Sequence, residues 1–140
     1  MRILVTGNLG YVGSVLGSYI QSSHPDWNLA GIDAGFFADC LTGEDPSHHY
    51  HRQVIRDVRD LTKSDLEGID AIVHLAAVSN DSAGNEYEVA TKAVNIDASR
   101  RLADLARQAK VRRFVFASSC SIYGAADQHP RREQPLAIDR

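Results

Sequence analysis

The 140-residue sequence has little of what marks several protein classes. Its two cysteines, Cys40 and Cys120, lack the spacing of zinc ligands and are too few for a disulfide framework. No apolar run approaches the length of a membrane span, and the N-terminus lacks the layout of a signal peptide. We therefore expect no metal, no membrane partner and a reducing, cytoplasmic location.

The sequence also has no excess of positive charge. The net charge is −3 and the sequence has no basic cluster, so we expect no nucleic-acid partner. Three histidines, His48, His49 and His51, fall in a long loop predicted over residues 36–52. They are either metal ligands or part of a solvated loop. Because no Cys-x-x-Cys pair or carboxylate cluster accompanies them, the sequence favours the solvated loop.

The sequence does contain a glycine-rich turn between a strand and a helix. Residues 2–5 form a short apolar run, which is typical of a buried parallel strand, and residues 12–20 show helical spacing. Gly7, Gly10 and Gly13 stand between them. Glycines allow a sharp turn and the close approach of a diphosphate, and the free N–H groups that start a helix favour an anion. The stretch predicts a dinucleotide site, and a turn without a ligand is the alternative.

A second predicted strand, residues 27–33, ends in the acid Asp33, 20 residues beyond Gly13. A carboxylate there can accept hydrogen bonds from both hydroxyls of an adenosine ribose, and it would repel a 2′-phosphate. Residues 34–37 include no arginine that could bind such a phosphate. We therefore predict NAD rather than NADP as the cofactor. An acid in a surface loop is the other interpretation.

Two further strands are predicted over residues 53–56 and 69–77. Asp57 follows the first of them and can accept from an adenine amino group, with Val58 packing on the ring. The second leaves the sheet through two alanines at 76 and 77, small enough to lie beneath a flat cofactor. His74 lies in this strand, and we interpret it as a packed core histidine rather than a catalytic one.

The longest helical pattern covers residues 86–109 and contains Asn95. Asparagine is a poor helix former, so a buried one there needs a hydrogen-bonded reason. A fifth strand, predicted over 113–117, runs directly into Ser118 and Ser119. Hydroxyls at the carboxyl end of a strand fall where an open α/β sheet binds its ligands.

Taken in order, these motifs resemble the extended short-chain dehydrogenase/reductase family, and specifically its NAD-dependent nucleotide-sugar epimerases and dehydratases. The matching pieces are Thr6-Gly7-Asn8-Leu9-Gly10-Tyr11-Val12-Gly13, Asp33, Asp57-Val58, His74-Leu75-Ala76-Ala77, Asn95 and Ser118-Ser119-Cys120-Ser121-Ile122-Tyr123-Gly124. The resemblance implies an α/β fold with a truncated, Rossmann-type doubly wound parallel sheet of about five strands in the order 3-2-1-4-5. This domain would cover residues 1–124, and residues 125–140 would form an irregular tail.

The resemblance also implies a role for each matching residue on the adenosine side of a bound NAD. The diphosphate would lie on the backbone of the glycine turn, which consists of Gly7, Asn8, Leu9, Gly10, Tyr11, Val12 and Gly13. Asp33 would hold the adenosine ribose. Asp57 and Val58 would bracket the adenine.

The remaining roles concern the nicotinamide and the substrate. The nicotinamide half would run along Leu75, Ala76 and Ala77. Ser118 would line the nicotinamide pocket, and Asn95 would stabilise the sheet and helix behind the site. Ser119 would be the catalytic serine that hydrogen-bonds the sugar hydroxyl or ketone.

One feature of the family is missing from these 140 residues. Its base is the tyrosine of a Tyr-x-x-x-Lys motif, in which the lysine lowers the pKa of the phenol. No tyrosine here is followed by lysine at that spacing, and the lysines are Lys63, Lys92 and Lys110. In relatives a stretch like residues 133–136 leads to that tyrosine. The resemblance therefore implies an N-terminal portion that ends just short of the motif.

We thus expect the NAD-binding portion of an enzyme that oxidises a sugar hydroxyl with NAD and later returns the hydride. A nucleotide sugar would bind once further sequence completes the site, and the chain alone would be inactive. The alternative is a non-catalytic NAD-binding module with a regulatory or scaffold role. Without the helix of the motif, apolar surface and the edge of the fifth strand should be exposed, which predicts a homo-oligomer or a complementing chain.

Overall fold

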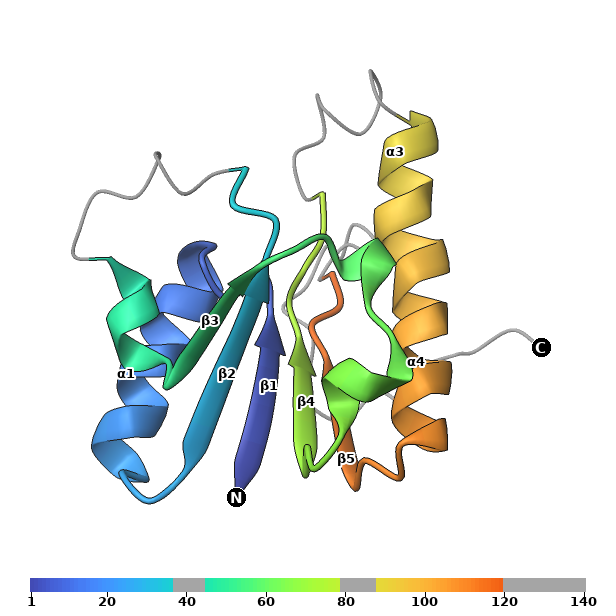
Figure 1. Ribbon diagram of the computed structural model, residues 1–140. Coiled ribbons are helices and arrows are strands. Elements are labelled where there is room, and N and C mark those ends of the chain that lie inside the picture. The colour runs from blue at the N-terminus through green and yellow to red at the C-terminus, as the bar shows by residue number, and fades with distance from the viewer. Residues whose placement is uncertain (37–44, 79–87, 120–140) are drawn as a thin grey trace, which may run out of the picture.

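The structure, a computed structural model, describes residues 1–36, 45–78 and 88–119 (Figure 1). Its centre is a five-stranded parallel sheet in the order β3-β2-β1-β4-β5. The strands are β1 (Arg2–Thr6), β2 (Asn28–Asp33), β3 (Arg52–Ile55), β4 (Ala71–His74) and β5 (Arg113–Phe116). The predicted α/β class, the Rossmann-type sheet and its strand order are confirmed.

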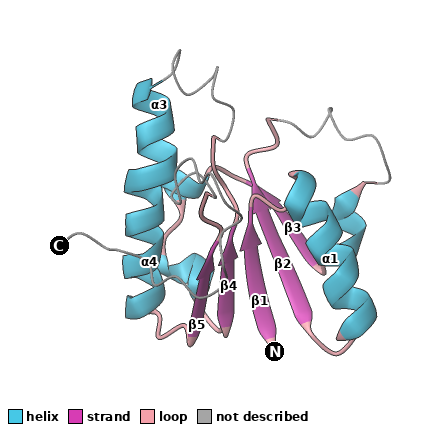
Figure 2. Ribbon diagram, turned by 180° about the vertical axis from the view of Figure 1, so that it is seen from behind, coloured by secondary structure: helices cyan, strands magenta, loops and turns pink. Residues whose placement is uncertain are grey.

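Helices cover the two faces of the sheet (Figure 1). On one side lie α1 (Tyr11–Ser23) and a 3-10 turn, Pro46–His49, which contact each other. On the other side lie α3 (Glu88–Lys92) and α4 (Ser99–Gln108), as the reverse view in Figure 2 also shows. The chain is therefore wound in both directions from the centre of the sheet, between β1 and β4.

Each face of the sheet has its own core, and β1 contributes to both. Leu4 belongs to the core on the α4 side, whereas Ile3 and Val5 belong to the core on the α1 side. All three are at most 3% exposed. Successive side chains of a strand point to opposite faces, so a central parallel strand must be apolar on both sides. This explains the unbroken apolar run that opens the sequence.

The long predicted helix is present but is not uniform. A π-helical segment, Ala93–Ala98, separates α3 from α4, and Asn95 lies within it. A π-helical turn holds an additional residue and commonly marks a site where a side chain has another task. The helical pattern shows only the apolar spacing, so it could not indicate this local widening. The predicted first residues of the helix, 86–87, lie outside the described residues.

The segment predicted as an irregular loop, residues 36–52, is more ordered than expected where it is described. Residues 46–49 form a 3-10 turn with Pro46 at its start and the Asp45 carboxylate accepting from the Ser47 N–H at 2.9 Å. β3 then begins at Arg52. The predicted tail, residues 125–140, lies outside the described residues, and so does the domain boundary at 124.

Candidate functional site

The predicted site residues gather at the edge of the sheet where the five parallel strands end (Figure 1). The glycine turn follows β1, Asp33 ends β2, and Asp57 comes shortly after β3. Residues 75–77 and 118–119 follow β4 and β5. In an open α/β sheet, ligands bind at this edge, in the crevice where the strand order reverses. Here the reversal lies between β1 and β4.

The three glycines of the turn serve different purposes. Gly7 has a φ of +75°, and a Cβ on it would lie 2.6 Å from the Ala76 backbone nitrogen. A Cβ on Gly13 would lie 2.5 Å from the Cα and carbonyl oxygen of Asn8. Both positions therefore require glycine for packing within the protein. A Cβ on Gly10 would meet only the Gly7 carbonyl oxygen, at 3.3 Å, so Gly10 keeps its other side open for a ligand.

The start of α1 presents backbone N–H groups to this open side. Gly10 is the N-cap, and the first helical bond runs from the Ser14 N–H to the Gly10 carbonyl at 3.0 Å. The N–H groups of residues 11–13 therefore lie in the first helical turn, where the helix itself supplies no acceptor. They and the helix dipole favour an anion, and the first turn of α1 holds no acidic residue that would compete. The turn fits a diphosphate.

The side chain of Asn8 lies inside the protein. Asn8 is fully buried, and its Nδ2 donates to Oε1 of Gln53 at 2.6 Å. A Cβ on Gly31 would come within 2.3 Å of that amide, so the glycine in β2 makes room for it. The side chain thus ties the turn to β3. A cofactor contact through Asn8 stays a prediction.

Asp33 braces the turn from the neighbouring strand. Its Oδ2 accepts from the Leu9 N–H at 3.1 Å, and its Oδ1 accepts from the Gly35 N–H at 2.8 Å. A carboxylate offers about four acceptor positions, so lone pairs remain on both oxygens for the two ribose hydroxyls. The predicted role in ribose binding is compatible with this geometry. The two hydrogen bonds also give Asp33 a structural role, holding the glycine turn, that the sequence does not indicate.

Asp57 and Val58 lie at the next strand end. The Asp57 carboxylate accepts from the Arg59 guanidinium at 2.7 and 3.0 Å, and these hydrogen bonds hold the pKa of that carboxyl below its ordinary value. Val58 is 8% exposed and packs in the core on the α4 side. Little of its side chain faces outward, so an adenine contact at Val58 would involve mainly its backbone.

The exit of β4 is held by Asn95. Its Oδ1 accepts from the Val78 N–H at 2.8 Å, and its Nδ2 donates to the Val78 carbonyl at 2.9 Å. This pair of bonds copies a backbone pairing and satisfies both polar groups of Val78. It is the hydrogen-bonded reason that the sequence predicts for an asparagine in a helix. Two of the predicted nicotinamide contacts, Ala76 and Ala77, immediately precede Val78.

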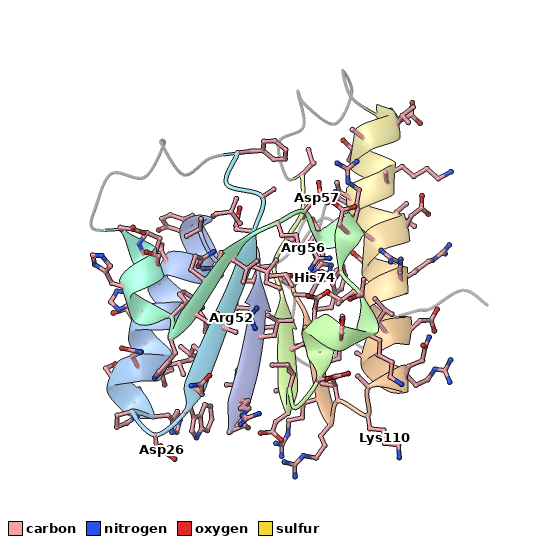
Figure 3. The ribbon with its side chains drawn as sticks, viewed as in Figure 1. Asp26, Arg52, Arg56, Asp57, His74 and Lys110 are labelled. Carbon is pink, nitrogen blue, oxygen red and sulfur yellow. The ribbon has the colours of Figure 1, made fainter. Side chains whose placement is uncertain are left out.

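His74 is a core residue, as predicted. It is 1% exposed, and its Nδ1 and Nε2 pair with the hydroxyls of Thr6 at 2.6 Å and Ser99 at 2.8 Å. Its ring, labelled in Figure 3, also lies beside the rings of Phe114 and Phe116. Burial lowers the pKa of the imidazole, which keeps it neutral. It joins β1, β4, β5 and α4 behind the site.

Ser118 and Ser119 are exposed and lie just beyond β5. Pairing with β4 extends to the Ala117 N–H, which donates to the His74 carbonyl at 3.1 Å. This brings both serines to the edge of the sheet where the other site residues lie. The rest of the matching motif, residues 120–124, falls outside the described residues, and the catalytic role of Ser119 stays a prediction.

Two residues near the site escaped the sequence reasoning. The Tyr50 hydroxyl donates to the Gly13 carbonyl at 2.9 Å, its ring packs against Gly17, and burial raises the pKa of its phenol. Gly17, in the middle of a helix, was the one local sign of such a close approach. Arg59 binds Asp57, and nothing in the sequence beyond its charge indicates this contact.

Among the described residues, no group of three or more metal-ligating side chains is arranged to hold an ion, and no helix has both the length and the apolar character needed to cross a bilayer.

Comparison with known proteins adds independent findings. The model of the NAD dependent epimerase/dehydratase family matches residues 3–138. The chain is 34% identical, over 133 residues, to an uncharacterized UDP-glucose epimerase of Bacillus subtilis, covering 89% of this chain and 42% of that protein. The first three curated relatives are covered over only 20%, 46% and 42% of their lengths, so the chain spans less than half of each.

Solved structures show the same similarity. The dTDP-glucose 4,6-dehydratase of Streptomyces venezuelae, with NAD bound, superposes with a TM-score of 0.80 at 30% identity, over 97% of this chain and 45% of that one. A UDP-glucose 4-epimerase from Stenotrophomonas maltophila, also with bound NAD, gives a TM-score of 0.80 at 27% identity, over 94% and 40%.

Proposed function

The chain belongs to the NAD-dependent epimerase/dehydratase family, and from this membership we propose that it forms the NAD-binding portion of a nucleotide-sugar epimerase or dehydratase. One observation carries the proposal. The first turn of α1 opens beside a glycine, Gly10, that leaves room for a diphosphate, while Asp33 stands at the neighbouring strand end. The solved relatives with bound NAD support the same cofactor.

In the proposed site, the diphosphate binds the N–H groups of residues 11–13. The adenosine ribose binds Asp33, which favours NAD over NADP because a 2′-phosphate would face a carboxylate. The adenine lies toward Asp57 and Val58. The nicotinamide lies along residues 75–77 with Ser118 beside it, at the reversal of strand order between β1 and β4.

NAD, when bound, supplies the hydride chemistry, while the protein must hold and move the proton. In this chain the proposed contribution is Ser119, whose hydroxyl would hydrogen-bond the sugar hydroxyl or ketone. The base and its lysine would come from a Tyr-x-x-x-Lys motif, which these 140 residues do not contain. We therefore expect these residues alone to bind NAD and to lack sugar-oxidising activity. A nucleotide sugar would bind only with further sequence present.

The second candidate is a non-catalytic NAD-binding module that regulates or scaffolds a partner. The intact mass of the natural gene product, together with its reading frame, separates the two. A frame that continues into Tyr-x-x-x-Lys supports the enzyme. A product that ends at residue 140, with no complementing chain, supports the module. Either one would work in the cytoplasm, as the composition leads us to expect.

We also propose that another polypeptide surface covers β5, in a homo-oligomer or from a complementing chain. Phe114, Val115 and Phe116 are 36%, 54% and 52% exposed, as expected for apolar residues that need a cover. Their exposure supports association without identifying the partner.

Calorimetric titration with NAD and with NADP tests the cofactor assignment. We expect NAD to bind and NADP to bind more weakly. A protein that is folded by circular dichroism and binds neither nucleotide would contradict the proposed function. Equal affinity for the two would contradict the role of Asp33 while leaving the dinucleotide site intact.

A further inference from the structure

The carboxylate of Asp57 is held in place by one neighbouring residue, Arg59. Oδ1 accepts from the Arg59 backbone N–H at 2.8 Å and from its Nε at 3.0 Å, and Oδ2 accepts from its Nη2 at 2.7 Å. The two guanidinium bonds form a fork, the geometry that fixes a carboxylate most firmly. With about four acceptor positions on a carboxylate, Oδ1 is filled and Oδ2 keeps one free position.

Arg59 is itself tied to the body of the protein. Its backbone carbonyl accepts from the guanidinium of Arg101 on α4. The adjacent Val58 is buried in the core, and Arg56 donates to the Asp60 carbonyl at 2.7 Å. The 3-10 turn Val58–Asp60 is therefore anchored on three sides. Figure 3 shows Asp57 and Arg56 where the chain leaves β3, close to the long helix.

We propose that Arg59 is a positioning residue, and this inference rests on the proposed function. Arg59 holds the Asp57 carboxylate so that Oδ2 can accept a hydrogen bond from the exocyclic amino group of adenine. Arg59 does not itself contact the cofactor. Its fork removes the rotational freedom of the Asp57 side chain before NAD arrives, so less order is lost on binding. The fork also keeps the carboxyl ionised and therefore able only to accept, which selects a base that carries a donor at this position.

A cofactor analogue separates this role from general support of the fold. In nicotinamide hypoxanthine dinucleotide, an oxo group replaces the amino group of adenine, and the adjacent ring nitrogen N1 carries a hydrogen instead of accepting one. An ionised carboxylate cannot donate to the oxo group. It therefore disfavours the analogue while it is fixed opposite that group, and a carboxylate free to rotate could turn to accept from the N1–H instead. The measured quantity is the ratio of the two dissociation constants.

The experiment titrates the protein and its Arg59→Gln variant with NAD and with the hypoxanthine analogue. Arg59→Gln should weaken NAD binding about three- to tenfold, the effect of ordering one side chain on binding. Binding of the analogue should change less, so the preference for NAD falls. Arg59→Lys keeps the charge but not the fork, and it should behave like Arg59→Gln. In the Asp57→Asn background, Arg59→Gln should have no further effect on NAD binding.

Arg107→Gln is the matched control, because it removes a guanidinium from an exposed pair with Asp104 on α4. It should leave both affinities unchanged, and thermal unfolding should show that every variant is folded. Equal weakening of both dinucleotides in Arg59→Gln, full rescue by Arg59→Lys, or unchanged affinities would each overturn the inference while NAD binding by the parent protein persists. A parent protein that binds no NAD would overturn the proposed function and this inference together.

Discussion

β1 and β5 are apolar strands of one parallel sheet, yet β1 is buried and β5 is exposed. Residues 3–5 of β1 are at most 3% exposed, whereas all four residues of β5 are exposed. β1 is covered by α1 on one face and by α4 on the other, and it has a strand on each side (Figure 2). β5 is an edge strand with a neighbour on one side only. An apolar run thus predicts a strand, but the helices and strands that pack against it decide whether the strand is buried in the core.

The polar groups of the two regions differ in the same way. At the ends of β2 and β3, the carboxylates of Asp33 and Asp57 are hydrogen-bonded within the protein, so they are oriented before any ligand binds. At the end of β5 the difference is one of cover, because Ser118 and Ser119 are both exposed. The adenosine side of the proposed site is therefore preorganised by this chain. The side where the substrate would bind depends more on what covers β5.

The largest expected effect concerns the turn beside β1. Gly7→Ala should destabilise the fold by about 3 kcal/mol, because it forces a side chain into a positive φ and against the Ala76 backbone. Gly10→Ala is the matched control. It should cost about 1 kcal/mol or less, yet it should weaken NAD binding, because its methyl group occupies the open side.

Urea unfolding followed by the fluorescence of Trp27, the single tryptophan, measures both stabilities. Equal costs for Gly7→Ala and Gly10→Ala would show that the contact of the turn with the β4 exit does not constrain the fold.

The same chemical change in both strands tests the comparison directly. Val5→Ala, at a fully buried position, should lower the free energy of unfolding by about 2 kcal/mol. In the monomer, Val115→Ala, at a position 54% exposed, should change it by about 0.5 kcal/mol or less. Sedimentation velocity on the same samples reports association. A cost for Val115→Ala as large as that for Val5→Ala in a monomeric sample would contradict the contrast between the strands, whereas the same cost in an associated sample would support the proposed cover of β5.

NAD affinity tests the difference between the adenosine side and the nicotinamide side of the proposed site. Asp33→Ala should weaken NAD binding by about 1–3 kcal/mol, through loss of the ribose bonds and of the brace on the Leu9 N–H. Ser118→Ala should weaken it by about 1 kcal/mol or less, since the loss is one neutral hydrogen bond. Titration calorimetry with NAD and NADP measures both. Unchanged NAD affinity in Asp33→Ala would remove this acid from the site.

A more gradual effect is the pH dependence of stability that comes from His74, which links the two regions. Burial holds its folded-state pKa below the unfolded value of about 6.5, so the unfolded chain takes up the proton first as the pH falls. Stability should therefore decrease below about pH 6.5, by up to about 1.4 kcal/mol per pH unit from this group. His74→Gln should flatten that part of the curve. Parallel curves for the two proteins would show that His74 does not titrate differently on unfolding.

Local patterns in the sequence predicted the strands and helices and their order along the chain. The family resemblance that the motifs carry implied the doubly wound sheet, and the structure has it. Such signals work because helix and strand periodicities involve residues close together along the chain. Asn95 is an intermediate case: its poor helix propensity predicted a special partner, and the structure identifies Val78.

Only the tertiary structure decided which side chains support the site. Asn8 meets Gln53 across 45 positions of sequence, Tyr50 reaches Gly13, and Thr6 meets His74 across 68 positions. It also decided that Val58 lies in the core and that β5, although as apolar as β1, is exposed. Periodicity carries no information about partners this distant, because they come together only when the strands take their order in the sheet and the helices pack on its two faces.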